Sequence, residues 1–189
     1  MVRHAVPSDV DSLVDLNRRW QREKLSSLAR GFLSVELSPE ACEGVIERGE
    51  AVGTFEGGRA VGYYLLNPAL KFHVLHDMVT RRRVGRGELA SGARVGHSTQ
   101  GVIETEYRGQ GLLARMVDLF CRRLQGRYDV VASTVDVRNP ASLRAHRKVG
   151  FRVVDSVGEV QVISRPVTVA APSAAPRPAR PRLALAALA

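Results

Sequence analysis

The sequence predicts a single α+β domain, and three observations support this class. Residues 101–151 read in the order strand, glycine-containing turn, helix, strand and helix. Two β-like runs, Ala51 to Glu56 and Arg59 to Leu66, are joined by Gly57-Gly58, the two-residue loop that tight hairpins favour. A hydrophobic share of 44% over 189 residues is ordinary for one globular domain with its own core. There is no internal repeat.

The chain before this hairpin is expected to hold two helices. The apolar run from Val2 to Val6 is compatible with an edge strand. Residues 8–11 have the pattern of a capping box, and the helix that follows is predicted to end near Arg22. Ser38 followed by proline is typical of a second helix start, and that helix is predicted to run to Arg48.

Residues 67–96 do not continue this regular pattern. Phe72 to Val79 is compatible with a helix, whereas Arg81 to Gly87 is predicted to be a loop. A connection of this length in a compact domain is usually functional or mobile, so we expect a basic loop insertion that acts as a flap. The strand is predicted to resume near Arg94.

The end of the chain is predicted to form a last hairpin and then a tail. Arg152 to Asp155 and Gly158 to Ile163 are β-like. From residue 166 onward the chain is mainly Ala, Pro, Val and Arg without periodicity, a composition that does not form a packed core. The expected organisation is therefore a domain over 1–165 and a disordered tail over 166–189.

Composition and charge narrow the class of partner. The net charge of +9 favours anionic partners in general. Aromatic residues make up only 5% of the chain, too few for the stacking platforms of single-strand binders, so nucleic acid is an unexpected partner. Two cysteines indicate no disulfide framework. The sequence shows no signal peptide and no apolar window of ~20 residues, so a cytoplasmic protein without membrane attachment is expected.

A phosphate-binding turn is predicted at Arg108-Gly109-Gln110-Gly111. The motif alone is weak evidence, because residues 82–87 match the pattern Arg/Gln-x-x-Gly-x-Gly/Ala more fully than this stretch does. Only the stretch at Arg108 follows a predicted strand, residues 101–104, and leads into an amphipathic helix. The first N–H groups of a helix have no partner inside it and can face an anion. A plain turn between strand and helix remains the alternative.

A second motif follows about thirty residues later, where Asn139 caps a helix, proline occupies its first position and Gly150 ends it. Together with the turn at Arg108, it resembles the GNAT superfamily of acyl-CoA N-acyltransferases, whose second signature is Asn-x-x-Ala/Ser-x-x-x-Tyr-x-Lys-x-Gly-Phe. The matching residues are Asn139, Ser142, Lys148, Gly150 and Phe151. The sequence departs from the family at His146, where Tyr is usual, and at Leu113, where the turn signature has Gly or Ala.

The resemblance implies a mixed, mostly antiparallel central sheet of six to seven strands flanked by about four helices. It also implies direct transfer of an acetyl group from acetyl-CoA, the co-substrate, to the primary amine of a small molecule or amino acid, without a metal. The residues expected at acetyl-CoA are Ile103, Thr105, Arg108, Gly109, Gln110, Gly111, Leu112, Leu113, Asn139 and Ser142. The first two would pair with the pantetheine arm through their backbone, and the turn would hold the pyrophosphate.

Acid and base catalysts are sought where the acetyl group is expected. Glu104, at the end of the central strand, is the first candidate for the base that takes the ammonium proton, with Asp136, Glu106 and His97 as alternatives. His146 stands in the place of the family's Tyr, and its imidazole titrates nearer neutrality than a phenol, so it is the candidate acid. A packing role for His146 and a solvated carboxylate for Glu104 remain open.

Other functions stay possible at this stage. His73, His76 and Asp77 are close in sequence but lack a third clear ligand at helical spacing, so no metal site is predicted. A relative that binds acyl-CoA or nucleic acid without catalysis is one alternative, and an acetyltransferase of protein amines is another. A homodimer is compatible with the sequence.

Overall fold

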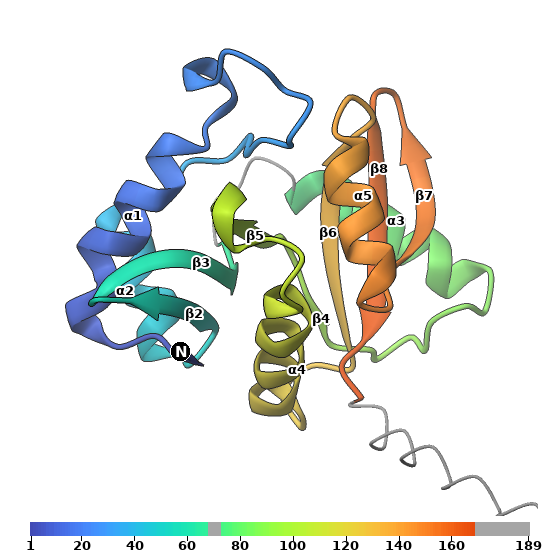
Figure 1. Ribbon diagram of the computed structural model, residues 1–189. Helices are drawn as coiled ribbons and strands as arrows, with labels where there is room; N and C mark the ends of the chain where they lie inside the picture. Colours follow the sequence, from blue (N-terminus) through green and yellow to red (C-terminus); the bar gives the residue numbers. More distant parts are fainter. Residues whose placement is uncertain (68–72, 169–189) are drawn as a thin grey trace, which may run out of the picture.

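The computed structural model describes residues 1–67 and 73–168. It contains two four-stranded sheets (Figure 1). The first has the order β1 (Val2–His4), β2 (Ala51–Glu56), β3 (Arg59–Leu66) and β5 (Thr99–Ile103), and all its pairs are antiparallel. The second has the order β4 (Val95–Gly96), β6 (Val130–Asp136), β8 (Val160–Pro166) and β7 (Arg152–Val157), with only β4 and β6 parallel. The α+β class and the mostly antiparallel pairing are thus confirmed.

The eight strands exceed the six to seven predicted because one predicted strand is divided. Ser98 has a positive φ of 63°, a conformation that interrupts a strand. Before it, β4 pairs with β6 of the second sheet, and after it β5 pairs with β3 of the first. The chain therefore changes sheets at this residue, which no hydrophobic pattern in the sequence indicates.

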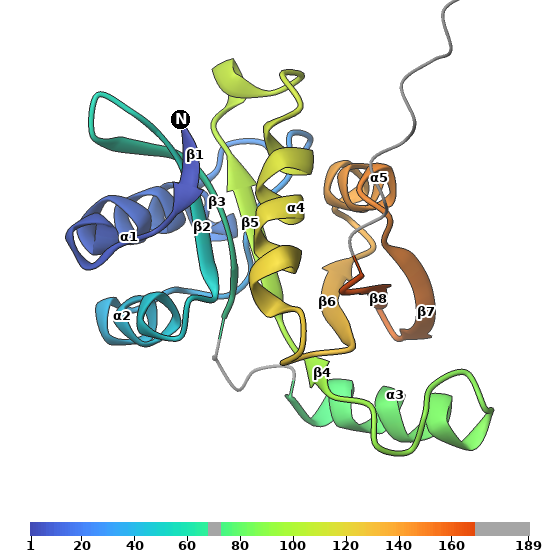
Figure 2. The ribbon, with the colours of Figure 1, turned by 90° about the horizontal axis from the view of Figure 1, so that it is seen from below.

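The described residues contain five α-helices: α1 (Val10–Arg19), α2 (Pro39–Glu47), α3 (His73–Gly85), α4 (Leu112–Leu124) and α5 (Pro140–Lys148). Figure 2 shows α1 and α2 on one side of the first sheet and α4 beside β5, facing the second sheet. Side chains alternate along β3, so Tyr63 packs into the core under α1 and α2, while Tyr64 packs against Phe120 of α4. Two apolar cores result, one on each face of the first sheet.

Several local predictions are confirmed and three are wrong. The Gly57-Gly58 hairpin forms as expected, and Ser38 Oγ accepts a hydrogen bond from Ala41 N at the start of α2. The box at residues 8–11 does not cap α1, because the Asp9 carboxylate instead accepts from Val6 N and from Arg3. α1 also ends at Arg19 rather than near Arg22.

The predicted loop from Arg81 to Gly87 is also corrected, since α3 continues to Gly85. Arginine has a high helix propensity, and two of these side chains find partners on the second sheet. Arg82 forms an ion pair with Asp155 at 3.4 Å, and Arg83 donates to Ser164 Oγ at 3.0 Å. Residues 68–72 of the expected flap and residues 169–189 of the expected tail lie outside the described residues. No helix in the described ranges is long and apolar enough to cross a membrane.

Candidate active site

A cavity of about 610 Å³ lies between β5 and β6. It exists because these neighbouring strands belong to different sheets and separate along their length. Glu104 N donates to Val61 O and Asn67 N donates to Ser98 O, so the even-numbered residues of β5 bond to β3. In an antiparallel pair the intervening residues then face outward, so Thr99, Gly101 and Ile103 present their backbone to the cavity.

Two of these three outward carbonyls already have partners. Ser133 Oγ of β6 donates to Thr99 O at 2.5 Å, and Arg108 Nε donates to Ile103 O at 2.8 Å. The backbone of Gly101 lies between them on the cavity wall. Only glycine fits here, because a Cβ would lie 2.5 Å from the ring of Tyr64. The open edge is thus centred on Gly101, two residues earlier than Ile103 and four earlier than Thr105, the positions that the resemblance implied.

The glycine turn lies at the end of the cavity where α4 begins. Gly109 and Gly111 line the cavity with φ of 79° and 71°, a left-handed conformation that disfavours other residues. A Cβ at either position would meet no atom within 4 Å, so the backbone conformation and not crowding requires glycine. Leu112 and Leu113 follow as the first residues of α4, and both line the cavity. The start of α4 and its N–H groups therefore face the cavity, as an anion site requires.

Three predicted cofactor residues have other surroundings. Thr105 begins the short 3-10 helix Thr105–Tyr107 and does not line the cavity, and neither does Gln110, whose Nε2 donates to Glu106 O at 3.3 Å. Arg108 lines the cavity but is committed to the protein. Besides Ile103 O, its guanidinium donates to Arg30 O at 2.6 Å and lies 4.5 Å from the centre of the Trp20 ring. These contacts fit an ordering role for Arg108, one of the two roles expected for it, and that role stays a prediction.

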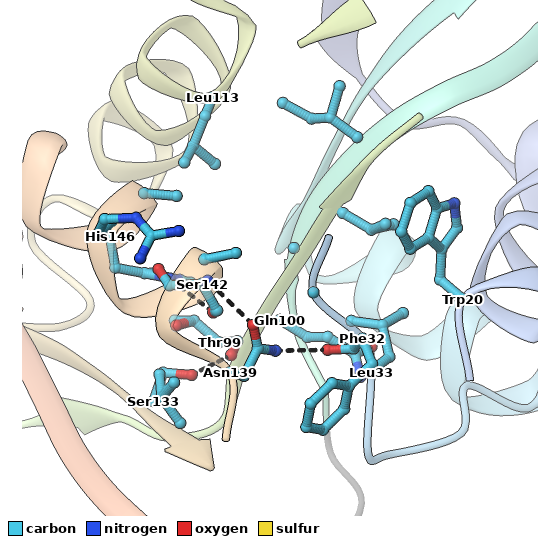
Figure 3. A pocket seen from close by; sticks show the side chains of 18 of the residues that line it. Trp20, Phe32, Leu33, Thr99, Gln100, Leu113, Ser133, Asn139, Ser142 and His146 are labelled. Carbon is cyan, nitrogen blue, oxygen red and sulfur yellow. Dashed lines mark hydrogen bonds between the residues drawn. The ribbon is translucent and has the colours of Figure 1, made fainter. Parts of the chain in front are cut away.

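Asn139 and Ser142, at the start of α5, lie on the wall of the cavity across from Trp20 and Phe32 (Figure 3). Asn139 is buried and works as the predicted cap, its Oδ1 accepting from Ser142 N at 3.0 Å. Its Nδ2 donates to Phe32 O at 2.9 Å. Residues 30–33, which we call the strap, are therefore held at Arg30 by the turn and at Phe32 by α5, and they close one side of the cavity.

His146 lies on the same wall, but its imidazole is 6% exposed. Its Nδ1 is 2.9 Å from the carbonyl oxygen of Ser142, which can only accept, so Nδ1 carries a proton. Burial lowers the pKa of His146, and its Nε2 has no partner among the described residues. The ring packs against Tyr64 and Phe151, at centroid distances of 6.0 and 5.1 Å. This geometry fits the packing role; the acid role stays a prediction.

Glu104 is not on the cavity wall. Its Oε1 accepts from Arg19 at 2.9 and 3.2 Å, and its Oε2 accepts from Trp20 Nε1 at 3.0 Å. Both carboxylate oxygens are therefore used to join α1 to the end of β5, which leaves Glu104 badly placed as a base. Neither Glu106 nor His97, which packs 4.9 Å from the ring of His76, lines the cavity. Of the alternatives, only Asp136 does.

Solved acetyltransferase structures have this architecture. A GNAT-family acetyltransferase from Streptococcus pneumoniae matches with a TM-score of 0.59 and 19% identity, over 89% of this chain and 99% of that one. A putative acetyltransferase from Salmonella typhimurium, solved with its cofactor acetyl-CoA, matches with a TM-score of 0.57 and 16% identity, over 93% and 98% of the two chains. The chain has the GNAT fold. A phosphinothricin acetyltransferase from Sinorhizobium meliloti, in complex with acetyl-CoA, matches with a TM-score of 0.56 and 16% identity over 88% and 87%. No family model and no curated protein matches the sequence.

In this GNAT fold, the cavity also has a polar floor that the sequence did not reveal. Gln100 of β5 is buried, and its Oε1 accepts from Asn17 Nδ2 and Tyr63 Oη, both at 3.1 Å. Its Nε2 donates to Val35 O at 2.7 Å. Trp20, Phe32 and Leu33 form the apolar wall beside this floor. The members come from segments up to 83 residues apart, so no local motif could have found them.

Proposed function

We propose that this protein transfers the acetyl group of acetyl-CoA to the primary amine of a small molecule or amino acid. The single observation that carries the proposal is the combination, in one cavity, of the outward backbone edge at Gly101 with the glycine turn that begins α4. Two solved proteins of the same fold hold acetyl-CoA. The acetyltransferase activity of such proteins supports an acyl-transfer reaction here.

The binding roles follow from the positions of the residues. The turn from Gly109 to Gly111 and the first N–H groups of α4 would bind the pyrophosphate, with the helix dipole adding to the attraction. The N–H and C=O groups of Gly101 would pair with the amide groups of the pantetheine arm, as one strand pairs with another. These residues fit such a ligand because they offer backbone donors along one continuous wall.

Acetyl-CoA would supply an acetyl thioester that an amine attacks directly. The protein then has to fix the two reactants in line and to donate a hydrogen bond to the developing oxyanion. The outward N–H groups of β5 are the proposed donors. The Ser142 hydroxyl, whose Oγ lies 3.3 Å from His146 Nδ1, is our candidate for protonating the departing thiolate. The proton that the hydroxyl gives up would be replaced by the one that the attacking nitrogen loses.

The test is a thiol-release assay with acetyl-CoA and a panel of amines, with mass spectrometry of the acceptor to identify the acetylated product. Calorimetric titration with CoA measures binding separately. Acceptor-dependent release of thiol together with an acetylated amine is the expected result. CoA binding without release for any acceptor would overturn the enzyme proposal and favour a protein that only binds acyl-CoA.

A further inference from the structure

The cavity contains almost no negative charge. Residues 68–72 and 169–189 include no Asp or Glu, so every acidic side chain of this protein belongs to the described part. Among all of them, Asp136 alone lines the cavity. Its carboxylate accepts from Arg138 N, Nε and Nη2 at 2.8, 2.9 and 2.6 Å, and Arg22 lies 3.9 Å away. The one carboxylate on the wall is therefore neutralised by arginines.

The part of the cavity beside Trp20, Phe32 and Leu33, where we place the acceptor, has the same character. Its walls are the apolar side chains of Trp20, Phe32 and Leu33, and its floor is the neutral amide of Gln100. Two arginines lie against these walls, because Arg108 stacks on Trp20 and Arg22 lies 5.6 Å from the Phe32 ring. The carboxylate of Glu104 also contacts the Trp20 indole, but it is off the cavity wall and is paired with Arg19. An alkylammonium ion would lose its hydration here and gain no unpaired carboxylate.

Among the described residues, no side chain that lines the cavity is well placed as a base: Asp136 is bonded to Arg138, and the free Nε2 of His146 is buried. An alkylamine is protonated at neutral pH and has to lose that proton before its nitrogen can attack. Glu104 is bonded to Arg19 and Trp20, and the bonds from Arg138 hold the pKa of Asp136 below its usual range. Neither carboxylate is well placed to take an ammonium proton.

We propose that the natural acceptor is a weakly basic amine that is uncharged at neutral pH and is carried on an aromatic body, that is, an arylamine. This inference rests on the proposed function and names its substrate class. The aromatic ring would lie between Trp20 and Phe32, with the amino group toward Gln100. The nitrogen lone pair forms the bond to the acetyl carbon as the carbon–sulfur bond breaks. The nitrogen then loses one proton and the thiolate gains one, so the products are an amide and free CoA, with no added base.

Two isomeric probes test the inference, because 4-methylaniline and benzylamine have the same composition and nearly the same size. The value of kcat/KM is measured for both with acetyl-CoA between pH 6 and pH 9. We expect 4-methylaniline to react at least about tenfold faster at pH 7, with a flat profile above pH 6. Benzylamine should gain about tenfold per pH unit, since only its neutral fraction reacts. A preference for benzylamine at pH 7, or equal values for the two, would overturn the inference.

A variant provides a second test that is independent of the natural preference. Gln100→Glu places a carboxylate at the cavity floor, where Asn17 Nδ2 and Tyr63 Oη already donate to the side-chain oxygen. The ratio of kcat/KM for benzylamine to that for 4-methylaniline should rise at least tenfold in the folded variant. An unchanged ratio would contradict the inference. Thiol release with alkylamines but not arylamines would refute this inference alone, whereas CoA binding without release for any amine would refute the proposed function.

Discussion

The turn at the start of α4 provides a quantitative test of the anion site. Gly111→Glu would place a carboxylate beside the position proposed for the pyrophosphate, and Gly111→Gln would place a neutral side chain of the same shape there. Both substitutions force an L side chain into the left-handed conformation, at φ of 71°, which costs roughly 1–2 kcal/mol of stability in either variant. The open space around Gly111 means that neither side chain meets a protein atom at its Cβ. The two variants therefore differ mainly in charge.

Coulomb's law gives the expected size of that difference. At about 5 Å and an effective dielectric constant of about 20, one unit of like charge costs about 3 kcal/mol, or on the order of 100-fold in Kd. Calorimetric titration with CoA at moderate salt should thus show Gly111→Glu binding about 100-fold more weakly than Gly111→Gln. The two melting temperatures should agree closely, which controls for folding. Equal affinities for the two variants would refute the assignment of this turn to the pyrophosphate.

Three further predictions concern two residues near the cavity, Glu104 and Asn17, and one buried residue of α3, His76. Glu104→Gln should change kcat less than about threefold. It should also shift the fluorescence emission of Trp20, the only tryptophan, because it alters the partner of the indole N–H. A loss of about 100-fold in kcat with unchanged CoA affinity would instead make Glu104 the base. Asn17→Ala should lower the free energy of unfolding by about 3 kcal/mol in urea titration, since it leaves several buried groups unpaired. The control Asp15→Ala, on the exposed side of α1, should cost under about 0.5 kcal/mol, and similar losses for the two variants would contradict a stabilising role for the hydrogen bonds of Asn17. Burial lowers the pKa of His76 to about 3, so below about pH 6.5 the unfolded chain binds a proton that the folded chain does not. The free energy of unfolding should therefore fall by roughly 2 kcal/mol from pH 7 to pH 5, and His76→Phe should remove that dependence. An unchanged pH dependence in the variant would show that other groups cause it.

Local signals were sufficient for most of the fold. The hairpin at Gly57-Gly58, the cap at Ser38 and the cap at Asn139 each form as the sequence predicts, because in each case neighbouring residues satisfy the backbone groups concerned. The exchange of sheets at Ser98 was not predictable, since it depends on which distant strand each side can pair with. The same holds for the site. The turn and α5 could be predicted from sequence motifs, whereas the polar floor at Gln100 could not, because it depends on contacts between distant segments.

The competition between the two arginine–glycine stretches shows why context, and not the motif, carries the information. Residues 82–87 match the turn pattern more fully, yet they lie at the end of α3, where Arg86 forms an ion pair with Glu88 at 2.6 Å. There, Gly85 is the last residue of a helix and Gly87 follows it, so no free helix N–H groups point at a common ligand. At Arg108 the glycines precede a helix and follow a strand whose outward edge borders the same cavity. An anion site needs converging backbone donors beside a place for the rest of the ligand, and only the order strand, turn, helix supplies both.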